Sequence, residues 1–139
     1  MLRNLVIVWG FAFVIAYASF WIRTADAREA ERLYISPDTA FLLDDAIWVD
    51  ASMSSLTKLD IPGRRVFPAT QTTYDSVIAP MLARGGAVIV FCDAGCNASI
   101  TLAKQWASTT QSDKVFAIRG GTVEIRKFVD KLNTYKPQQ

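Results

Sequence analysis

Two cysteines, Cys92 and Cys96, are the residues of this chain best suited to carry out chemistry. They are its only cysteines, and the chain contains no histidine. Catalytic triads that depend on histidine are therefore excluded, and two cysteines provide too few ligands for a structural zinc ion. We expect a site without a metal or other cofactor, in which thiols, carboxylates, hydroxyls, amides or cations act.

A strand and a helix are predicted on either side of this cysteine pair. Residues 87–91 form a short apolar run rich in β-branched residues, which is typical of a strand buried on both faces of a parallel sheet. A helical pattern that includes Trp106 follows, with Asn97 and Ser99 as candidate caps. Cys92 would then lie where loop amides and the helix dipole favour an anion such as a thiolate, and a helix N-terminus lowers the pKa of a thiol.

The size and charge of the chain limit what it can bind. It has 139 residues, and its 15 basic and 13 acidic residues are interspersed, with a net charge of +2. No basic tract favours binding to a nucleic acid, and the length beyond the N-terminal segment suits one ordinary domain. The sequence predicts a membrane segment at residues 1–27, a linker at 28–34 and one domain at 35–135.

Residues 5–22 are 18 consecutive residues without a charge. This length is close to the roughly 20 residues that cross a bilayer. One interpretation is an uncleaved single-pass membrane anchor, as in a bacterial inner membrane, which the length of the run and the position of Arg23 favour. The other is a signal peptide cleaved after Ala27, which would make the domain secreted or periplasmic. Basic residues flank the run almost equally, so the side of the membrane that the domain faces stays open.

Strands alternate with helices through the rest of the chain. The predicted strands are residues 46–50, 66–68, 87–91 and 114–118, and the predicted helices are a short one after Ser36, one over 74–82, the one that includes Trp106, and one over 123–132. The alternation predicts an α/β protein with a doubly wound parallel sheet, preceded by one transmembrane helix. We expect Trp48 and Trp106 in the core, and Arg64 as an ordinary surface cation.

The apolar residues of the last predicted helix are available for its inner face. They are Val123, Phe128, Val129 and Leu132. We expect this helix to close the domain, because its other positions are mostly polar or charged.

Five short motifs follow one another between Leu33 and Leu132. They are Ile35-Ser36-Pro37, the strand-end Asp50, the turn Ile61-Pro62-Gly63, the strand, loop and helix around Cys92, and Arg119-Gly120-Gly121. In order and spacing they resemble a single rhodanese-like (sulfurtransferase) domain. The resemblance implies that Cys92 takes a sulfane sulfur from a donor such as thiosulfate, becomes a persulfide and passes the sulfur on. Its partners would be a small sulfur donor and acceptor, or a thiol protein.

A persulfide is anionic, so the resemblance implies a loop whose backbone amides hold it. The candidate amides are those of Asp93, Ala94, Gly95, Cys96, Asn97 and Ala98. Gly95 permits an unusual backbone conformation in this loop. Two supporting residues are also candidates: Asp50, which would position the loop or bond to nearby backbone, and Arg119, which would bring a cation to the site.

The loop also departs from active members of the family. It has no cation, although an arginine often stands at the position of Asn97, and Asp93 is expected to raise the pKa of the neighbouring thiol and to repel an anionic donor. Ala98 stands where the related phosphatases have an arginine, which argues against phosphatase activity. One alternative is therefore a catalytically inactive rhodanese-fold module that binds a membrane-protein partner. Another is a thiol redox protein, in which Cys96 resolves a persulfide or sulfenate on Cys92 into a disulfide.

Overall fold

The chain divides into two compact units, Met1–Arg32 and Leu33–Gln139. The structure is a computed structural model that describes residues 2–52, 59–94 and 96–135, with side chains from residue 12 onward. The first unit consists of helix α1, Leu2–Leu33, which also runs through most of the predicted linker at 28–34. The second unit contains the predicted domain at 35–135.

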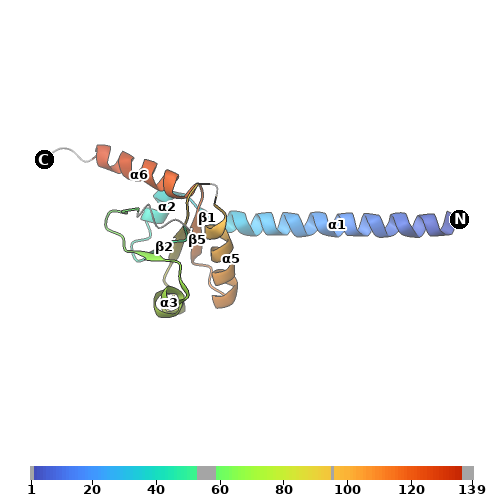
Figure 1. Cartoon of the computed structure of the whole chain (residues 1–139), viewed down its shortest axis with the longest axis horizontal. Coiled ribbons are helices and arrows are strands. Elements are labelled where there is room, and N and C mark those ends of the chain that lie inside the picture. The colour runs from blue at the N-terminus through green and yellow to red at the C-terminus, as the bar shows by residue number, and fades with distance from the viewer. Residues whose placement is uncertain (1, 53–58, 95, 136–139) are drawn as a thin grey trace. The chain divides into compact units, whose positions relative to one another are not determined.

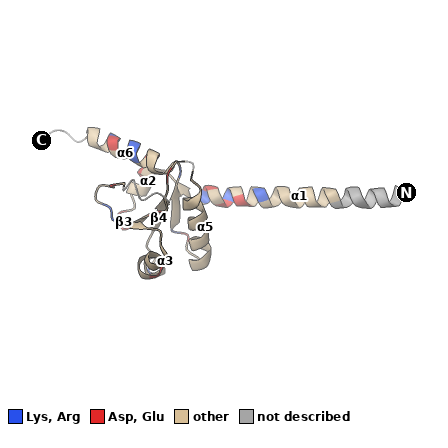
Figure 2. Cartoon of the chain, viewed as in Figure 1, with Lys and Arg blue, Asp and Glu red and all other residues tan. Residues whose placement is uncertain are grey.

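Large apolar side chains of α1, among them Phe13, Phe20 and Trp21, are exposed. Apart from Arg3, the charged residues of this helix lie between Arg23 and Arg32, toward its C-terminal end (Figure 2). Within the described part of the chain, no helix is long and apolar enough to cross a membrane. The side chains of residues 5–11, the first part of the span predicted at 5–22, lie outside the described residues, so the anchor stays a prediction.

In the described residues, five strands form one parallel sheet in the order β1-β5-β4-β2-β3. The strands are β1 Tyr34–Ile35, β2 Ile47–Asp50, β3 Val66–Pro68, β4 Val88–Phe91 and β5 Val115–Ile118. The four predicted strands are confirmed, whereas β1 was missed because two residues are too short to show a periodic pattern. The central strand is β4, and all four of its residues are buried, as expected for a strand covered on both faces.

Helices cover both faces of this sheet. They are α2 Pro37–Phe41, α3 Gln71–Thr73, the π-helical turn η1 Tyr74–Ile78, α4 Ala79–Ala83, α5 Ala98–Thr110 and α6 Gly121–Tyr135. Helices α2 and α6 lie on one side of the strands, and α3 and α5 lie on the other (Figure 1). The fold is therefore α/β with a parallel sheet covered on both sides, consistent with the doubly wound class.

Two residues of β4 pack in the main hydrophobic core of the domain. Ile89 and Phe91 pack in one buried cluster with Trp48 of β2, Ala40 of α2 and Ile125 of α6. The alternate residues of β4 point to the opposite face, because side chains of a strand alternate with a period of two. Both tryptophans expected in the core are buried. Full burial of a large apolar side chain contributes about 1.5–3 kcal/mol, so the packing of β4 contributes strongly to the stability of the fold.

The inner face of α6 differs in part from the prediction. Ile125 is fully buried and Val129 packs against the same cluster, because residues four apart lie on one face of a helix. The Phe128 ring packs against the ring of Phe41 in a tilted arrangement, with the ring centres 4.9 Å apart, as expected for an inner residue. Val123 is 42% exposed, because it lies about half a turn away from Ile125, and Leu132, toward the helix end, is 41% exposed. These two were wrongly assigned to the inner face.

Candidate functional site

Cys92 follows β4 directly and is 1% exposed. Its carbonyl oxygen accepts a 3.0 Å hydrogen bond from the amide of Thr122, in the first turn of α6. A Cβ atom on Gly121 would clash with this same carbonyl, and Gly121 has a φ of +58°, which favours glycine. The start of α6 therefore rests on the backbone of Cys92, and only glycine fits at this contact.

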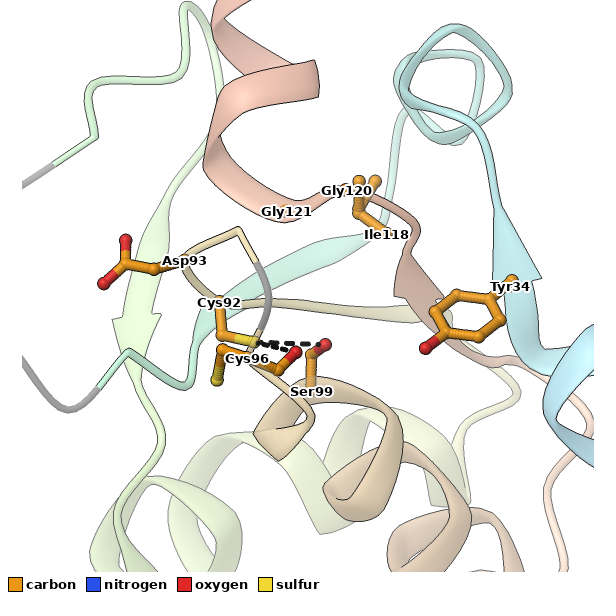
Figure 3. Close-up of a pocket in the computed structure, with 8 residues that line it drawn as sticks. All are labelled: Tyr34, Cys92, Asp93, Cys96, Ser99, Ile118, Gly120 and Gly121. Atoms are coloured by element: carbon orange, nitrogen blue, oxygen red, sulfur yellow. Dashed lines mark hydrogen bonds between the residues drawn. The ribbon is translucent and has the colours of Figure 1, made fainter.

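The Cys92 thiol is held by two oxygen atoms (Figure 3). It donates to the carbonyl oxygen of Cys96 at 3.1 Å and lies 3.4 Å from the hydroxyl oxygen of Ser99. Burial raises the pKa of the Cys92 thiol above its ordinary value, the side chain of Cys96 acts in the same direction, and Ser99 opposes both. Removal from water therefore outweighs the lowering expected from the helix N-terminus, and the pKa of Cys92 rises in the direction expected from Asp93 but with burial as its main cause.

Cys96 has different surroundings from those of Cys92. Its side chain is partly exposed, and both cysteines are free thiols. Its amide donates to the carbonyl oxygen of Asp93 at 3.0 Å, which folds the loop back onto Cys92. The amide of Ala98, the first residue of α5, lies 3.4 Å from the Cys96 sulfur and donates to it. The amide at the start of the helix therefore faces Cys96.

Both cysteines line a small pocket with a volume of about 30 Å³. The described residues around it are Tyr34, Cys92, Asp93, Cys96, Ser99, Ile118, Gly120 and Gly121 (Figure 3). Sequence reasoning missed Tyr34, which reaches the site through the short strand β1, and it considered Ser99 only as a helix cap. Ser99 carries a signal that was available, because its position seven residues after Cys92 places it in the first turn of the helix.

Two amides of the predicted cradle bond to other groups: that of Cys96 donates to the Asp93 carbonyl oxygen, and that of Ala98 donates to the Cys96 sulfur. Asn97 is exposed and makes no side-chain cap bond, although it is the residue before α5. Ala94 is exposed as well, and Gly95 lies outside the described residues. The backbone amide that acts on the Cys92 thiol is that of Ser99, one residue beyond the predicted cradle.

Asp93 and the two supporting candidates, Asp50 and Arg119, interact with groups other than the Cys92 sulfur. The Asp93 carboxylate accepts from the Thr122 hydroxyl at 3.3 Å, and its side chain points away from the Cys92 sulfur (Figure 3). The Asp50 carboxylate accepts a 2.8 Å bond from the amide of Ser52, which confirms the predicted bond to nearby backbone. The Arg119 guanidinium lies 4.7 Å from the centre of the Tyr34 ring, beside a residue of the pocket.

Arg64 corrects another expectation, because its side chain is only 13% exposed. The guanidinium donates to the carbonyl oxygens of Phe41, Leu43 and Asp44 and pairs with the Asp44 carboxylate at 3.2 Å. These carbonyls lie at and just after the end of α2, where a helix leaves acceptors without backbone partners. Arg64 is thus a structural residue and brings no charge to the cysteines.

In the described parts of the chain, no three or more His, Cys, Asp or Glu residues come together in a way that could hold a metal ion. The chemistry that the arrangement supports directly is that of the two thiols, with the Ser99 hydroxyl and amide as hydrogen-bond partners of Cys92.

Comparison with known proteins gives a likeness in fold only. The chain matches no protein-family model and no curated protein. Among solved structures, it is similar to the crystal structure of the BH2092 protein from Bacillus halodurans, with a TM-score of 0.51 and 17% sequence identity. The match covers 82% of this chain and 80% of the other. At this identity the likeness shows the shared fold and carries no statement about activity.

Proposed function

We propose that this chain is a membrane-anchored, rhodanese-like sulfur carrier in which Cys92 holds a persulfide. The observation that carries the proposal is the position of Cys92, which ends the central strand of a parallel sheet and borders a pocket of about 30 Å³. Open parallel sheets commonly have their sites beyond the carboxyl ends of the strands. We assign this site to the rhodanese-like family because the short motifs from Ile35 to Gly121 resemble that family in their order and spacing.

The Ser99 hydroxyl and amide suit a persulfide at this position. Both act to lower the pKa of the Cys92 thiol, which means that they stabilise negative charge on its sulfur. The terminal sulfur of a persulfide is anionic and benefits from the same donors. A single added sulfur atom also fits a pocket that has room for about two water molecules.

Attachment to a membrane through residues 5–22 is part of the proposal. It is supported by the uncharged run in the sequence and by the exposed apolar side chains of α1 from residue 13 onward. Flotation of the full chain with lipid vesicles tests it. We expect co-flotation that survives high salt and alkaline carbonate, and recovery of the chain in the soluble fraction would contradict an anchor.

Cyanide-releasable sulfur tests the carrier role. The full chain in detergent is incubated with thiosulfate or with inorganic polysulfide, freed of excess donor and treated with cyanide to form thiocyanate. We expect wild type to release a stoichiometric amount after polysulfide treatment and Cys92→Ser to release none. Equal release from both proteins would exclude Cys92 as the carrier. Circular dichroism of the variant controls for loss of fold.

The burial of Cys92 favours one alternative, a catalytically inactive rhodanese-fold module that binds a membrane partner. A thiol that is 1% exposed and has a raised pKa is a weak nucleophile at neutral pH. This alternative predicts that neither donor transfers sulfur to the chain and that Cys92 resists alkylation in the folded state. Sulfur uptake that requires Cys92 would exclude it.

A further inference from the structure

A sulfur donor in solution has less access to Cys92 than to Cys96. Cys92 is 1% exposed, and the adjoining pocket of about 30 Å³ has room for about two water molecules. Cys96 lines the same pocket and is partly exposed. Of the two thiols, Cys96 is therefore the more accessible to a dissolved donor.

The hydrogen bonds of the two sulfur atoms point to the same division of roles. The Cys96 sulfur accepts from the amide of Ala98, the first residue of α5, at 3.4 Å. The Cys92 sulfur instead donates its proton to the Cys96 carbonyl oxygen at 3.1 Å, as a neutral thiol does. The same contact places the backbone of Cys96 directly against the Cys92 thiol.

We infer that Cys96 is the thiol that receives sulfur from the donor, and that Cys92 then takes the sulfur from Cys96 and stores it in the pocket. The inference rests on the proposed function, because it requires that Cys92 carries a persulfide. The donor class is a small organic persulfide, R–S–SH. Such a donor carries no sulfonate, which suits a pocket lined by Asp93 and by no lysine or arginine among its described residues.

The relay consists of two exchanges that need no oxidant or reductant. In the first, the Cys96 thiolate attacks the outer sulfur of R–S–SH, a bond from Cys96 to that sulfur forms, and the donor S–S bond breaks to release R–S⁻. In the second, Cys92 attacks the same outer sulfur as its S–S bond to Cys96 breaks. The electron pair stays on the Cys96 sulfur, which takes the proton that Cys92 loses, and Cys92 ends as the persulfide.

Proteolysis before Asp93 separates the two cysteines and allows the order of transfer to be measured. The full chain in detergent is mixed with cysteine hydropersulfide, quenched with acid after defined times, alkylated and cleaved at aspartate. Mass spectrometry then reports sulfur on the fragment that ends at Cys92 and on the fragment that contains Cys96. We expect sulfur on Cys96 first and on Cys92 later.

Two variants complete the test. In Cys96→Ser, sulfur uptake by Cys92 should slow by about tenfold or more, because the accessible thiol is gone. The backbone carbonyl that binds Cys92 remains in this variant, and Cys96→Ala should behave in the same way. In Cys92→Ser, sulfur should reach Cys96 but should not accumulate there, because the reverse exchange with R–S⁻ returns it to the donor and the thiol that stores it is absent.

Three results would overturn the relay. Uptake by Cys92 at the wild-type rate in Cys96→Ser would show direct loading, and the proposed function would stand. Release of hydrogen sulfide with formation of a Cys92–Cys96 disulfide would show redox chemistry in place of sulfur storage. Absence of sulfur on both cysteines of the wild type would exclude the relay and the proposed function together.

Discussion

The Arg64 cluster, which consists of Arg64 and its partners Phe41, Leu43 and Asp44, differs from the cysteine pocket in the groups that surround a buried polar side chain. Arg64 is charged and largely buried, and it donates to three carbonyl oxygens and to the Asp44 carboxylate. The Phe41 ring also lies 5.9 Å from its guanidinium carbon. Cys92 is buried as well, but the groups that bond to its sulfur are a carbonyl, a hydroxyl and the Ser99 amide, and no cation is among the described residues of its pocket.

This difference shows how the fold selects a charge state. A buried charge is tolerated where hydrogen bonds and a counter-charge replace water, as they do for Arg64. At Cys92 no such counter-charge lines the pocket, so burial favours the neutral thiol and raises its pKa. Transfer chemistry at Cys92 therefore depends on a neighbouring group or on alkaline pH to form the thiolate.

The largest expected effect comes from the contact beneath Cys92. Gly121→Ala should lower the free energy of unfolding by about 3–4 kcal/mol, because the new Cβ meets the Cys92 carbonyl and the residue has a positive φ. Denaturant unfolding of the full chain measures the change. The matched control is Gly85→Ala, at a φ of +76° with nothing within 4 Å of the added Cβ. Equal losses in both variants would mean that φ strain alone matters at Gly121.

Removal of the cation from the Arg64 cluster is the next test. Arg64→Ala should destabilise the chain by about 2 kcal/mol, since several carbonyl oxygens lose their donor. Arg65→Ala, at the neighbouring exposed position, should cost less than about 0.5 kcal/mol. Thermal and denaturant unfolding report both values. A small effect at Arg64 would show that water replaces the guanidinium and that the cluster is not structural.

The raised pKa of Cys92 predicts a steep pH dependence. In a Cys96→Ser background, alkylation of Cys92 should accelerate about tenfold per pH unit between about pH 7 and pH 9, because the thiolate fraction rises by that factor below the pKa. Iodoacetamide labelling with mass detection measures the rate. An alkylation rate that already reaches its plateau near neutral pH would contradict the raised pKa. It would indicate that Cys92 is an activated thiol.

The smallest expected effect concerns Asp93. Its carboxylate bonds to Thr122 and points away from the sulfur, and burial is the main cause of the raised pKa of Cys92. Asp93→Asn should therefore change the alkylation rate of Cys92 by less than about twofold at neutral pH. An acceleration by tenfold would restore the expectation drawn from the sequence, that this carboxylate suppresses the thiol.

Much of the fold could be predicted from local pattern. The apolar run before Cys92 and the run at 114–118 are short and β-branched, which predicts buried strands, and both are strands of the sheet. The strand β1 could not be predicted, because its two residues become a strand only through pairing with β5. The outward position of Val123 was missed for a related reason, since which side of α6 faces the sheet depends on how the whole helix docks.

The site was predictable only in part. The position of Cys92 between a strand and a helix follows from neighbouring residues, and so does its contact with Ser99 in the first helical turn. Tyr34 lies far upstream in the sequence and reaches the pocket only because β1 pairs beside β5. No pattern of spacing encodes such a contact.

The sequence by itself determined the strand, loop and helix around Cys92 and the alternation that leads to a parallel sheet, because these depend on residues close together in the chain. Tertiary structure decided the burial of Cys92, the direction in which its pKa moves, the bond from Ala98 to Cys96 and the engagement of Arg64 at the end of α2. The physical reason is that solvation and hydrogen bonding at a side chain depend on every element packed around it. Those elements come together only when the chain folds.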